Sequence, residues 1–429
     1  MLHQVTGDQK VLKRLNRLAL VRWVKAEPGL SRVDLAGRTG LTKTTVGLLV
    51  GELIHEGWLR QGGPAASAGA VGRRPSPLTL DPTRLGLLGA EVGVDYLNVV
   101  ACNLNGEILH SRLRPYRHRQ VSRSLRSLAG LVAKALEVLA AQRRRPLGLG
   151  VGVPAMIDAR DGTLRFAPNL GWHGVPVVQL LRAELAAAGC GRLPVSVLNE
   201  ANAAALGEYV FAAEQPTGPL VYLSMGVGLG AGVVLGDSLY LGHDGLAGEV
   251  GHTILERGGP PCACGRRGCA EAFVSQRAVS REATGRDAPI LPMEELVARV
   301  IRRDRATLRA AARAGAYLGL LLQNLGNTIN PGAIVLGGPL CQLGEAFLGP
   351  ALVSMRDNAG RYDYHRHSVR PCRFGLDACA VGSAGSVFQE HLHGLGLEAG
   401  VVGAPAPVGG RHARARGLRR TVTAPVRPG

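Results

Sequence analysis

The sequence predicts a small, mainly helical N-terminal module followed by a larger α/β domain built from two similar lobes. Three observations support this fold class. The chain has 429 residues, more than a single hydrophobic core usually serves. Residues 9–55 carry apolar side chains at helical spacing. From residue 85 onward, short apolar strands appear and begin to alternate with helices, as they do in α/β domains.

The N-terminal module begins with an amphipathic helix from Gln9 to Lys25, with lysines and arginines between its apolar residues. Ser31 is a good N-cap for a short helix that stops at Gly40, and Thr42 caps a third helix that runs to about His55. Short strands at 58–60 and 77–80 follow. This order of elements predicts a winged helix-turn-helix, a DNA-binding fold.

In a helix-turn-helix, the N-terminal side chains of the second helix of the pair face the bases of the major groove. Here those residues are Thr42, Lys43, Thr44 and Thr45. Arg73 and Arg74 are expected in the wing, where they would meet phosphates or the minor groove. The alternative is a set of core helices with solvated basic faces. The stretch 62–72, rich in glycine and alanine, fits a wing tip or a linker equally well.

Charge points to a polyanionic partner. The formal net charge is +18 and the pI is about 10.3, which favours nucleic acid or an anionic membrane surface. The most apolar run, 220–235, is short and broken by glycines, so we expect a cytoplasmic protein without membrane association. The segment 403–429 is rich in glycine, proline, alanine and arginine, and we expect a disordered basic tail.

The larger domain opens with three strands that predict a β-meander, followed by a helix and a buried strand. A second series of the same kind begins at Leu220, with paired strands, a later helix and another buried strand. This recurrence predicts two similar lobes with a cleft between them. The expected elements are 85–92, 97–103, 107–112, 124–142 and 147–153 in the first lobe, and 220–224, 230–235, 306–327 and 333–336 in the second.

One loop carries a metal-ligand pattern. His252, Cys262, Cys264 and Cys269 offer one imidazole and three thiolates on a stretch rich in glycine and proline. That number and softness of ligands suits a closed tetrahedral zinc site, whose role is structural because no position stays open for water. The alternative is four reduced side chains that merely share a loop.

Several motifs together resemble the ROK family of bacterial sugar repressors and sugar kinases, which belongs to the actin-like ATPase superfamily. The resemblance runs from Lys10 to about His391. It implies residues 1–82 as the DNA-binding module and 83–402 as an actin-like, sugar kinase-like domain that binds a ligand. The motifs are Ala167-Pro168-Asn169-Leu170-Gly171-Trp172, Asn199-Glu200-Ala201-Asn202-Ala203-Ala204, Gly248-Glu249-Val250-Gly251-His252, and the cysteine cluster with Glu271.

The resemblance also implies a sugar site. A sugar-binding pocket needs carboxylates and amides held on rigid turns, because each sugar hydroxyl both donates and accepts hydrogen bonds. The residues matched by motif are Asn169, Asn199, Glu200, Glu249, His252 and Glu271. Ala155 stands where a glycine is common in the family, which leaves the backbone geometry beside the sugar open. The partners implied are operator DNA, a sugar or sugar derivative, and further copies in a homodimer or homotetramer.

Three departures from the family's kinases predict that phosphoryl transfer is lost. Glu200 stands at the catalytic base position, where the kinases have aspartate. The first phosphate loop reads 91–95 as Glu-Val-Gly-Val-Asp, without the kinases' glycine pair and threonine. Val227 replaces a threonine in the second glycine-rich loop, 226–232. We therefore expect no enzyme and only a vestigial base.

Three hypotheses remain at the level of sequence. The first is a sugar-responsive transcriptional regulator, most simply a repressor, in which the sugar changes operator affinity. The second is an active ATP-dependent sugar kinase with an added DNA-binding arm, motivated by Glu200 and the retained glycines. The third is a constitutive DNA-binding scaffold that binds no sugar.

Overall fold

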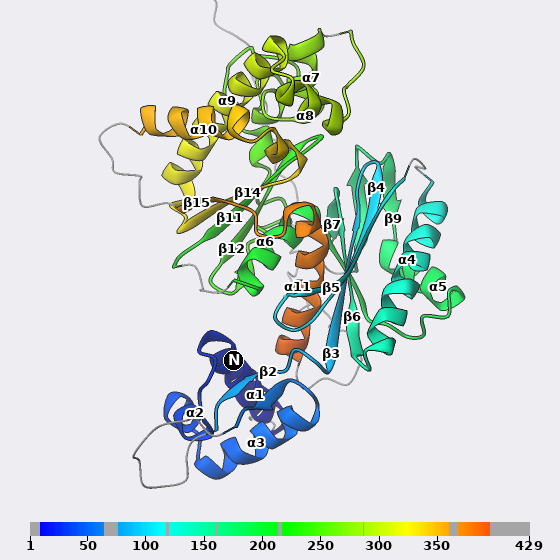
Figure 1. Ribbon diagram of the computed structural model, residues 1–429, viewed down its shortest axis with the longest axis vertical. Coiled ribbons are helices and arrows are strands. Elements are labelled where there is room, and N and C mark those ends of the chain that lie inside the picture. The colour runs from blue at the N-terminus through cyan, green and yellow to red at the C-terminus, as the bar shows by residue number, and fades with distance from the viewer. Residues whose placement is uncertain are drawn as a thin grey trace, which may run out of the picture. The chain divides into compact units, whose positions relative to one another are not determined.

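A computed structural model describes residues 9–63, 76–116, 120–158, 161–212, 217–285, 287–359 and 368–394 (Figure 1). The N-terminal module consists of three helices and a two-stranded antiparallel sheet. Its elements are α1 (Gln9–Ala26), α2 (Arg32–Thr39), α3 (Lys43–His55), β1 (Leu59–Gln61) and β2 (Leu78–Leu80). Arg73 and Arg74, which we expected in a wing, lie outside the described residues.

Local capping explains why the module's helices begin and end where the sequence predicts. Ser31 forms a capping box with Asp34, and Gly40 ends α2 in the left-handed conformation with φ of 70°. The Thr42 hydroxyl accepts a hydrogen bond from the amide of Thr45 at 3.1 Å and so caps α3. The first strand begins one residue later than predicted, and Trp58 just before it is buried and packs against Phe388.

An ion-pair network fixes α3 against α1. The guanidinium of Arg17 bonds Glu56 through Nη1 at 2.9 Å and Glu52 through Nη1 at 3.1 Å. Lys13 adds a contact to Glu52 at 2.7 Å. Arg17 is buried, so it is screened less than a surface pair would be. The network therefore sets the orientation of α3 in the module.

The first lobe is a five-stranded sheet of order β10-β6-β3-β4-β5. Its first three strands form the predicted antiparallel meander, while β6 runs parallel to β3 and β10 parallel to β6. The elements are β3 (Leu85–Val92), β4 (Tyr96–Cys102), β5 (Ile108–Pro115), α4 (Val121–Ala141), β6 (Arg145–Val153), β7 (Met156–Asp158), β8 (Thr163–Ala167), β9 (Trp172–Val175), α5 (Val177–Ala187) and β10 (Val195–Asn199). Strands β7, β8 and β9 make a separate small sheet.

The second lobe repeats this topology, with the order β13-β12-β11-β14-β15. Again three antiparallel strands are followed by two parallel ones, which confirms the predicted recurrence. Its strands are β11 (Leu220–Met225), β12 (Leu229–Leu235), β13 (Ser238–Leu239), β14 (Ala333–Gly337) and β15 (Ser368–Pro371). Its helices are α7 (Gln276–Thr284), α8 (Met293–Ile301), α9 (Arg305–Ile329) and α10 (Glu345–Asp357), with short 3₁₀ helices η1 (Val250–His252), η2 (Ala270–Ala272), η3 (Pro339–Leu343) and η5 (Gly375–Asp377).

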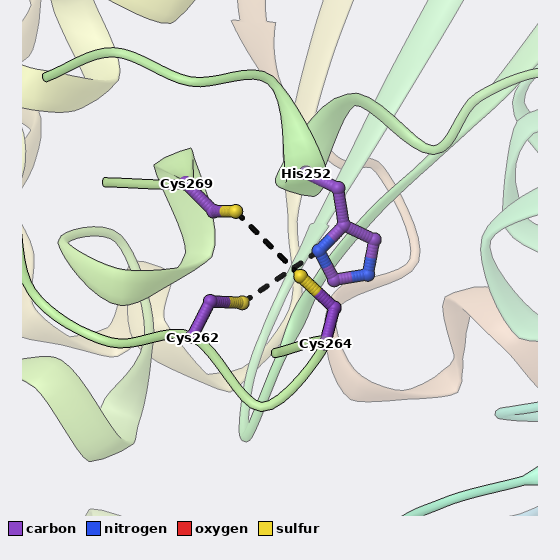
Figure 2. Close-up of side chains that lie close together, drawn as sticks. All are labelled: His252, Cys262, Cys264 and Cys269. Atoms are coloured by element: carbon purple, nitrogen blue, oxygen red, sulfur yellow. Dashed lines mark hydrogen bonds between the residues drawn. The ribbon is translucent and has the colours of Figure 1, made fainter. Parts of the chain in front are cut away.

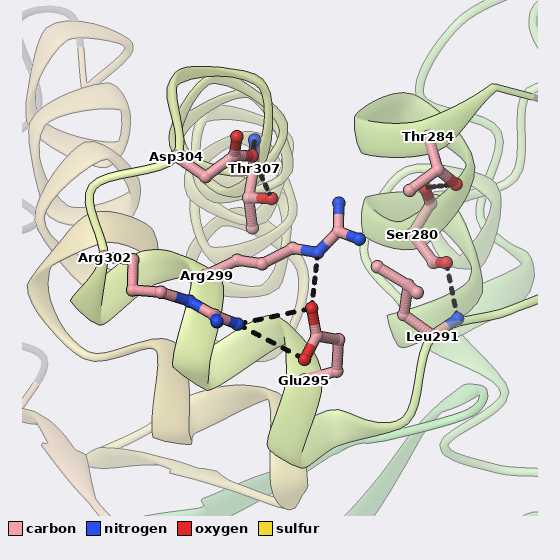
Figure 3. A network of polar contacts seen from close by, with 8 residues as sticks. All are labelled: Ser280, Thr284, Leu291, Glu295, Arg299, Arg302, Asp304 and Thr307. Carbon is pink, nitrogen blue, oxygen red and sulfur yellow. Dashed lines mark hydrogen bonds and ion pairs between the residues drawn. The ribbon is translucent and has the colours of Figure 1, made fainter.

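Local polar contacts stabilise three helices of the second lobe, each separately (Figure 3). Glu295 on α8 accepts from Arg299 at 2.9 Å and from Arg302 at 3.4 Å. The Ser280 hydroxyl on α7 accepts from the amide of Leu291 at 2.8 Å, which fastens the segment between α7 and α8. Asp304 caps α9 through Thr307 at 2.8 Å. Helices α7 and α9 also contact η2, the short segment that carries Glu271.

Two helices, α6 (Glu200–Val210) and α11 (Ala378–Gly394), cross in close contact, and α11 also packs on β3 and β6. Their small residues are needed for the crossing. A Cβ at Gly382 would come within 1.8 Å of the carbonyl oxygen of Ala203. Helix α6 begins at the predicted sugar site, and the close crossing ties that site to α11.

Candidate functional site

The four predicted metal ligands converge on one point (Figure 2). Their ligand atoms all lie within 4.8 Å of one another. The Sγ atoms of Cys264 and Cys269 are 3.7 Å apart, and Sγ of Cys262 is 3.7 Å from Nδ1 of His252. Two thiolates on one tetrahedral zinc are separated by about 3.8 Å when each Zn–S bond is about 2.3 Å. The donor set and its spacing therefore fit a four-coordinate metal ion.

Backbone hydrogen bonds shape the loop that carries the cysteines. The amide of Cys262 donates to the carbonyl of Arg266 at 2.8 Å, and the amide of Gly265 donates back to Cys262 at 3.1 Å. Gly268 has φ of 73°, and a Cβ there would meet the carbonyl oxygen of Glu256 at 1.7 Å. Only glycine fits at this position. The chain thus holds the thiols together through its own backbone.

The electrostatics of the thiols differ. Burial opposes ionisation of Cys264, but hydrogen bonds from the backbone and side chain of Arg266 prevail and lower the pKa of Cys264 to about 6. Burial raises the pKa of Cys262 to about 12. A bound metal ion deprotonates a coordinating thiol outright, so binding would release a proton from Cys262 at neutral pH.

His252 joins the metal cluster to the predicted sugar site. Its Nδ1 faces Cys262, while its Nε2 lies 3.9 Å from Oε2 of Glu249. Both residues come from the turn that opens η1. A carboxylate behind a metal-ligating histidine typically fixes the orientation of the ring. His252 was predicted both to ligate the metal and to contact the sugar. In the structure its Nδ1 faces the metal cluster, and its Nε2 lies on the side of Glu249.

Glu271 lies between the metal cluster and the second glycine-rich loop. Its Oε2 accepts from the amide of Leu229 at 3.2 Å, and its Oε1 accepts from Sγ of Cys262 at 3.7 Å. A Cβ at Gly228 would come within 2.7 Å of the Glu271 carboxylate. The retained glycine at 228 therefore makes room for Glu271, an explanation that requires no phosphate.

Asn199 and Glu200 lie where β10 passes into α6. The Asn199 side chain caps α6 by accepting from the amides of Ala201 at 2.9 Å and Asn202 at 3.2 Å, and its Nδ2 donates to the carbonyl of Ala155 at 3.2 Å. Ala155 has negative φ, so alanine is compatible with the turn where the family commonly has glycine. The Asn199 oxygen is thus committed to capping α6, while its side-chain nitrogen keeps a second N–H for a ligand.

Glu200 presents an unpaired atom to the site. Its Oε2 is buried and has no hydrogen-bond partner, while its Oε1 lies 3.9 Å from the Cβ position of Gly230. Burial, helped by the charges of Glu91 and Glu249, raises the pKa of Glu200 to about 8. Glu200 is therefore largely protonated at pH 7. A ligand hydroxyl would supply the partner that the buried carboxyl lacks.

The turn at 93–96, after β3, is filled by a side chain. Tyr96 donates its hydroxyl to Oε1 of Glu91 at 2.5 Å, and its ring lies 2.6 Å from the Cβ position of Gly93. The amide of Gly93 donates to the carbonyl of Tyr96 at 2.9 Å, which closes a tight hairpin. Burial raises the pKa of Glu91 to about 7, although hydrogen bonds from Tyr96 and Cys379 oppose the shift.

The structure also places the predicted DNA-contacting residues of α3. Lys43 and Thr44 are exposed in the first turn. The hydroxyls of Thr42 and Thr45 lie 2.9 Å apart, and that of Thr42 caps the helix. Thr42 and Thr45 therefore use their hydroxyls within the helix terminus. Asn169, the sixth predicted sugar contact, is half-buried in the turn between β8 and β9, and its role stays a prediction.

Comparison with known proteins decides the family. The sequence model of the ROK family matches residues 87–389, well over half of the chain. The chain belongs to the ROK family. The xylose repressor of Bacillus subtilis, strain 168, is 30% identical over 393 residues, covering 90% of this chain and 98% of the repressor. The glucokinase of Thermotoga maritima is 31% identical over 327 residues, covering 72% of this chain and 99% of the glucokinase.

Among solved structures, a ROK family transcriptional regulator described as a homolog of the E. coli MLC protein superimposes with a TM-score of 0.73. It is 23% identical, and the match covers 90% of this chain and 98% of that one. At this identity the likeness shows a shared fold. Among the described residues, no helix is both long and apolar enough to cross a membrane.

Sequence reasoning missed two features of the site. Tyr96 was not singled out, because nothing in its spacing shows that its ring folds back over Gly93. Cys379 was not singled out either, although its thiol contributes to the pKa of the buried Glu91. The signal for Tyr96 was its position immediately after the turn that replaces the first phosphate loop.

Proposed function

We propose that this protein is a sugar-responsive transcriptional repressor that binds operator DNA through its N-terminal module and a sugar through its ROK domain. The observation that carries the proposal is the extent of the repressor match. A kinase is matched almost completely by 72% of the chain, whereas the repressor match takes in 90% of it. The family model begins only at residue 87, after the three-helix module.

The module has what a winged helix needs. Helices α2 and α3 are joined by the tight turn at Gly40, and β1 and β2 form a hairpin whose connection includes Arg73 and Arg74. Between residues 9 and 63 there are ten lysines and arginines against four acidic residues. This excess supports α3 as the helix that enters the major groove and the basic connection as the wing.

The metal cluster is proposed to hold a structural zinc ion. His252, Cys262, Cys264 and Cys269 would supply all four ligands, so zinc would contribute stability to the loop and no activated water. Through the Nε2 of His252 and the contact of Cys262 with Glu271, the same loop positions two carboxylates of the proposed sugar site. Metal occupancy would therefore affect sugar affinity without any contact between the ion and the sugar.

The proposed sugar site combines three residues of the first lobe, Asn169, Asn199 and Glu200, with three of the second lobe, Glu249, His252 and Glu271. Protonated Glu200 would donate to one sugar oxygen, and ionised carboxylates would accept from hydroxyls. Apart from Asn169, the site's residues lie at the start of α6, at η1 and in η2. A sugar bound by all three segments would favour one relative arrangement of them, which is the differential affinity that regulation requires.

We infer that kinase chemistry is absent. Phosphoryl transfer needs a base at the attacking hydroxyl and backbone amides around the phosphates. Glu200 is one methylene longer than the kinases' aspartate, Tyr96 covers Gly93, and the amide of Leu229 is bonded to Glu271. Sugar-dependent ADP formation well above background would instead favour the alternative, an active ATP-dependent sugar kinase.

Fluorescence anisotropy tests the proposal directly. Labelled fragments of the DNA upstream of the protein's own gene and its neighbours are titrated with protein at one stated salt concentration, with and without each sugar of a panel. We expect one fragment to bind specifically and one sugar to weaken that binding. Absence of specific binding to every fragment would overturn the proposal.

A further inference from the structure

The outward face of α3 is apolar where a DNA-reading helix usually carries polar side chains. Val46, Leu49, Val50 and Leu53 face the core of the module, which turns Thr44, Gly47, Leu48 and Gly51 to the opposite side. The Leu48 side chain is 67% exposed, more than any other large apolar side chain among residues 9–63. Leucine at such a position contributes nothing to the module's own core.

Two glycines flank Leu48 on this face. A Cβ at Gly47 or at Gly51 would meet no atom of the protein within 4 Å, so packing within the chain requires glycine at neither position. Both lie inside a helix of 13 residues, where glycine weakens the helix relative to alanine. The missing side chains at these two positions therefore allow another molecule to come close to the helix backbone beside Leu48.

The charges around this face of α3 indicate which kind of partner it would contact. Exposed Lys43 begins α3, and exposed Arg60 follows on β1. Glu52, the acidic residue within α3, is turned toward α1 and bonded to Lys13 and Arg17. An uncharged face bordered by cations complements the major groove, whose phosphate walls are anionic and whose floor carries one apolar group, the 5-methyl of thymine.

We propose that Leu48 reads operator sequence by contacting thymine methyl groups, and that Gly47 and Gly51 let the α3 backbone approach the base edges. The inference deepens the proposed DNA-binding function and rests on it. It names the ligand chemistry, an operator half-site with thymines where Leu48 reaches the groove. It also extends direct readout beyond Lys43 and Thr44 to the middle of α3.

Replacing thymine by deoxyuridine in the bound fragment removes the methyl group and nothing else. For the wild-type protein, we expect affinity to fall about fourfold for each contacted methyl, the value of one buried carbon group. Leu48→Ala should bind the thymine operator about tenfold more weakly and should no longer distinguish thymine from uracil. Val33→Ala, which shortens a side chain 60% exposed on α2, is the matched control and should change neither quantity.

Substitution of the two glycines should change stability and DNA affinity in opposite directions. Gly47→Ala and Gly51→Ala should raise the melting temperature, because alanine favours the helix, yet should weaken operator binding. If wild-type protein binds a specific operator but uracil substitution and Leu48→Ala both leave its affinity unchanged, the inference is wrong and the proposed function stands. If wild-type protein binds no operator, both fall. If Leu48→Ala binds more weakly but still distinguishes thymine from uracil as the wild type does, the role assigned to Leu48 is also wrong.

Discussion

Replacing Glu91 by glutamine should change how the stability of the protein depends on pH. Burial raises the pKa of Glu91 to about 7 in the folded chain, against 4.5 for an ordinary glutamate. Between these values the folded state holds a proton that the unfolded state has released. The free energy of unfolding therefore falls as pH rises from about 4.5 to about 7. At about 1.4 kcal/mol per pKa unit, the loss is roughly 3 kcal/mol.

The Glu91→Gln variant keeps an oxygen for the Tyr96 hydroxyl and cannot titrate. Its melting temperature, measured by differential scanning fluorimetry from pH 5 to pH 8.5, should fall less than that of the wild type. The gap should open by roughly 3 to 5 °C, because an unfolding entropy of about 2.1 cal/mol/K per residue makes 1 kcal/mol worth about 1–1.6 °C in a chain of this size. Glu137→Gln, on the exposed face of α4, is the control and should follow the wild type. Parallel curves for the wild type and Glu91→Gln would refute the burial argument.

Three further predictions follow from the metal cluster, the sugar site and the tail. Cys264→Ser should lose about one zinc per chain by elemental analysis and melt several degrees lower, whereas Cys341→Ser should keep the metal; retained zinc in Cys264→Ser would contradict the assignment. Glu200→Ala should weaken sugar binding at least about tenfold by calorimetry without unfolding the protein, and unchanged heats would remove Glu200 from the site. Deleting residues 403–429, which carry six arginines, should flatten the salt dependence of DNA binding, and an unchanged slope would assign the tail no phosphate contacts.

Local signals explain which parts of the fold could be predicted. The module's helices were bounded correctly because Ser31, Gly40 and Thr42 act on the chain within three or four residues of themselves. The first meander and the strand pair of the second lobe were found because short apolar strands and tight turns are short-range patterns, whereas the two-residue strand β13 was not predicted. Helices α6 and α11 were not delineated, because both are rich in small residues and are buried on most sides. Without a polar face, they give no amphipathic period.

The candidate site was predictable in its residue types and not in its connections. The spacing of His252 and the cysteines specified the cluster, because few other functions need that donor set. The bond from the Leu229 amide to Glu271 joins residues 42 positions apart, so no sequence pattern reveals it. The hydroxyls of Thr42 and Thr45 bond to each other at the helix terminus, which the sequence did not show, and their contact with DNA stays a prediction. Whether these hydroxyls bond within the helix depends on side-chain geometry, which no sequence pattern specifies.

Reciprocal titration tests the central claim most directly, since coupling between two ligands must be the same in both directions. The dissociation constant for operator DNA is measured without sugar and at saturating sugar, and the dissociation constant for the sugar is measured without DNA and at saturating DNA, all in one buffer. We predict that sugar weakens DNA binding and that DNA weakens sugar binding by the same factor, about 5 to 150. If both ligands bind and both factors equal one, the DNA-binding module and the ROK domain are uncoupled, and the protein is not a sugar-responsive repressor.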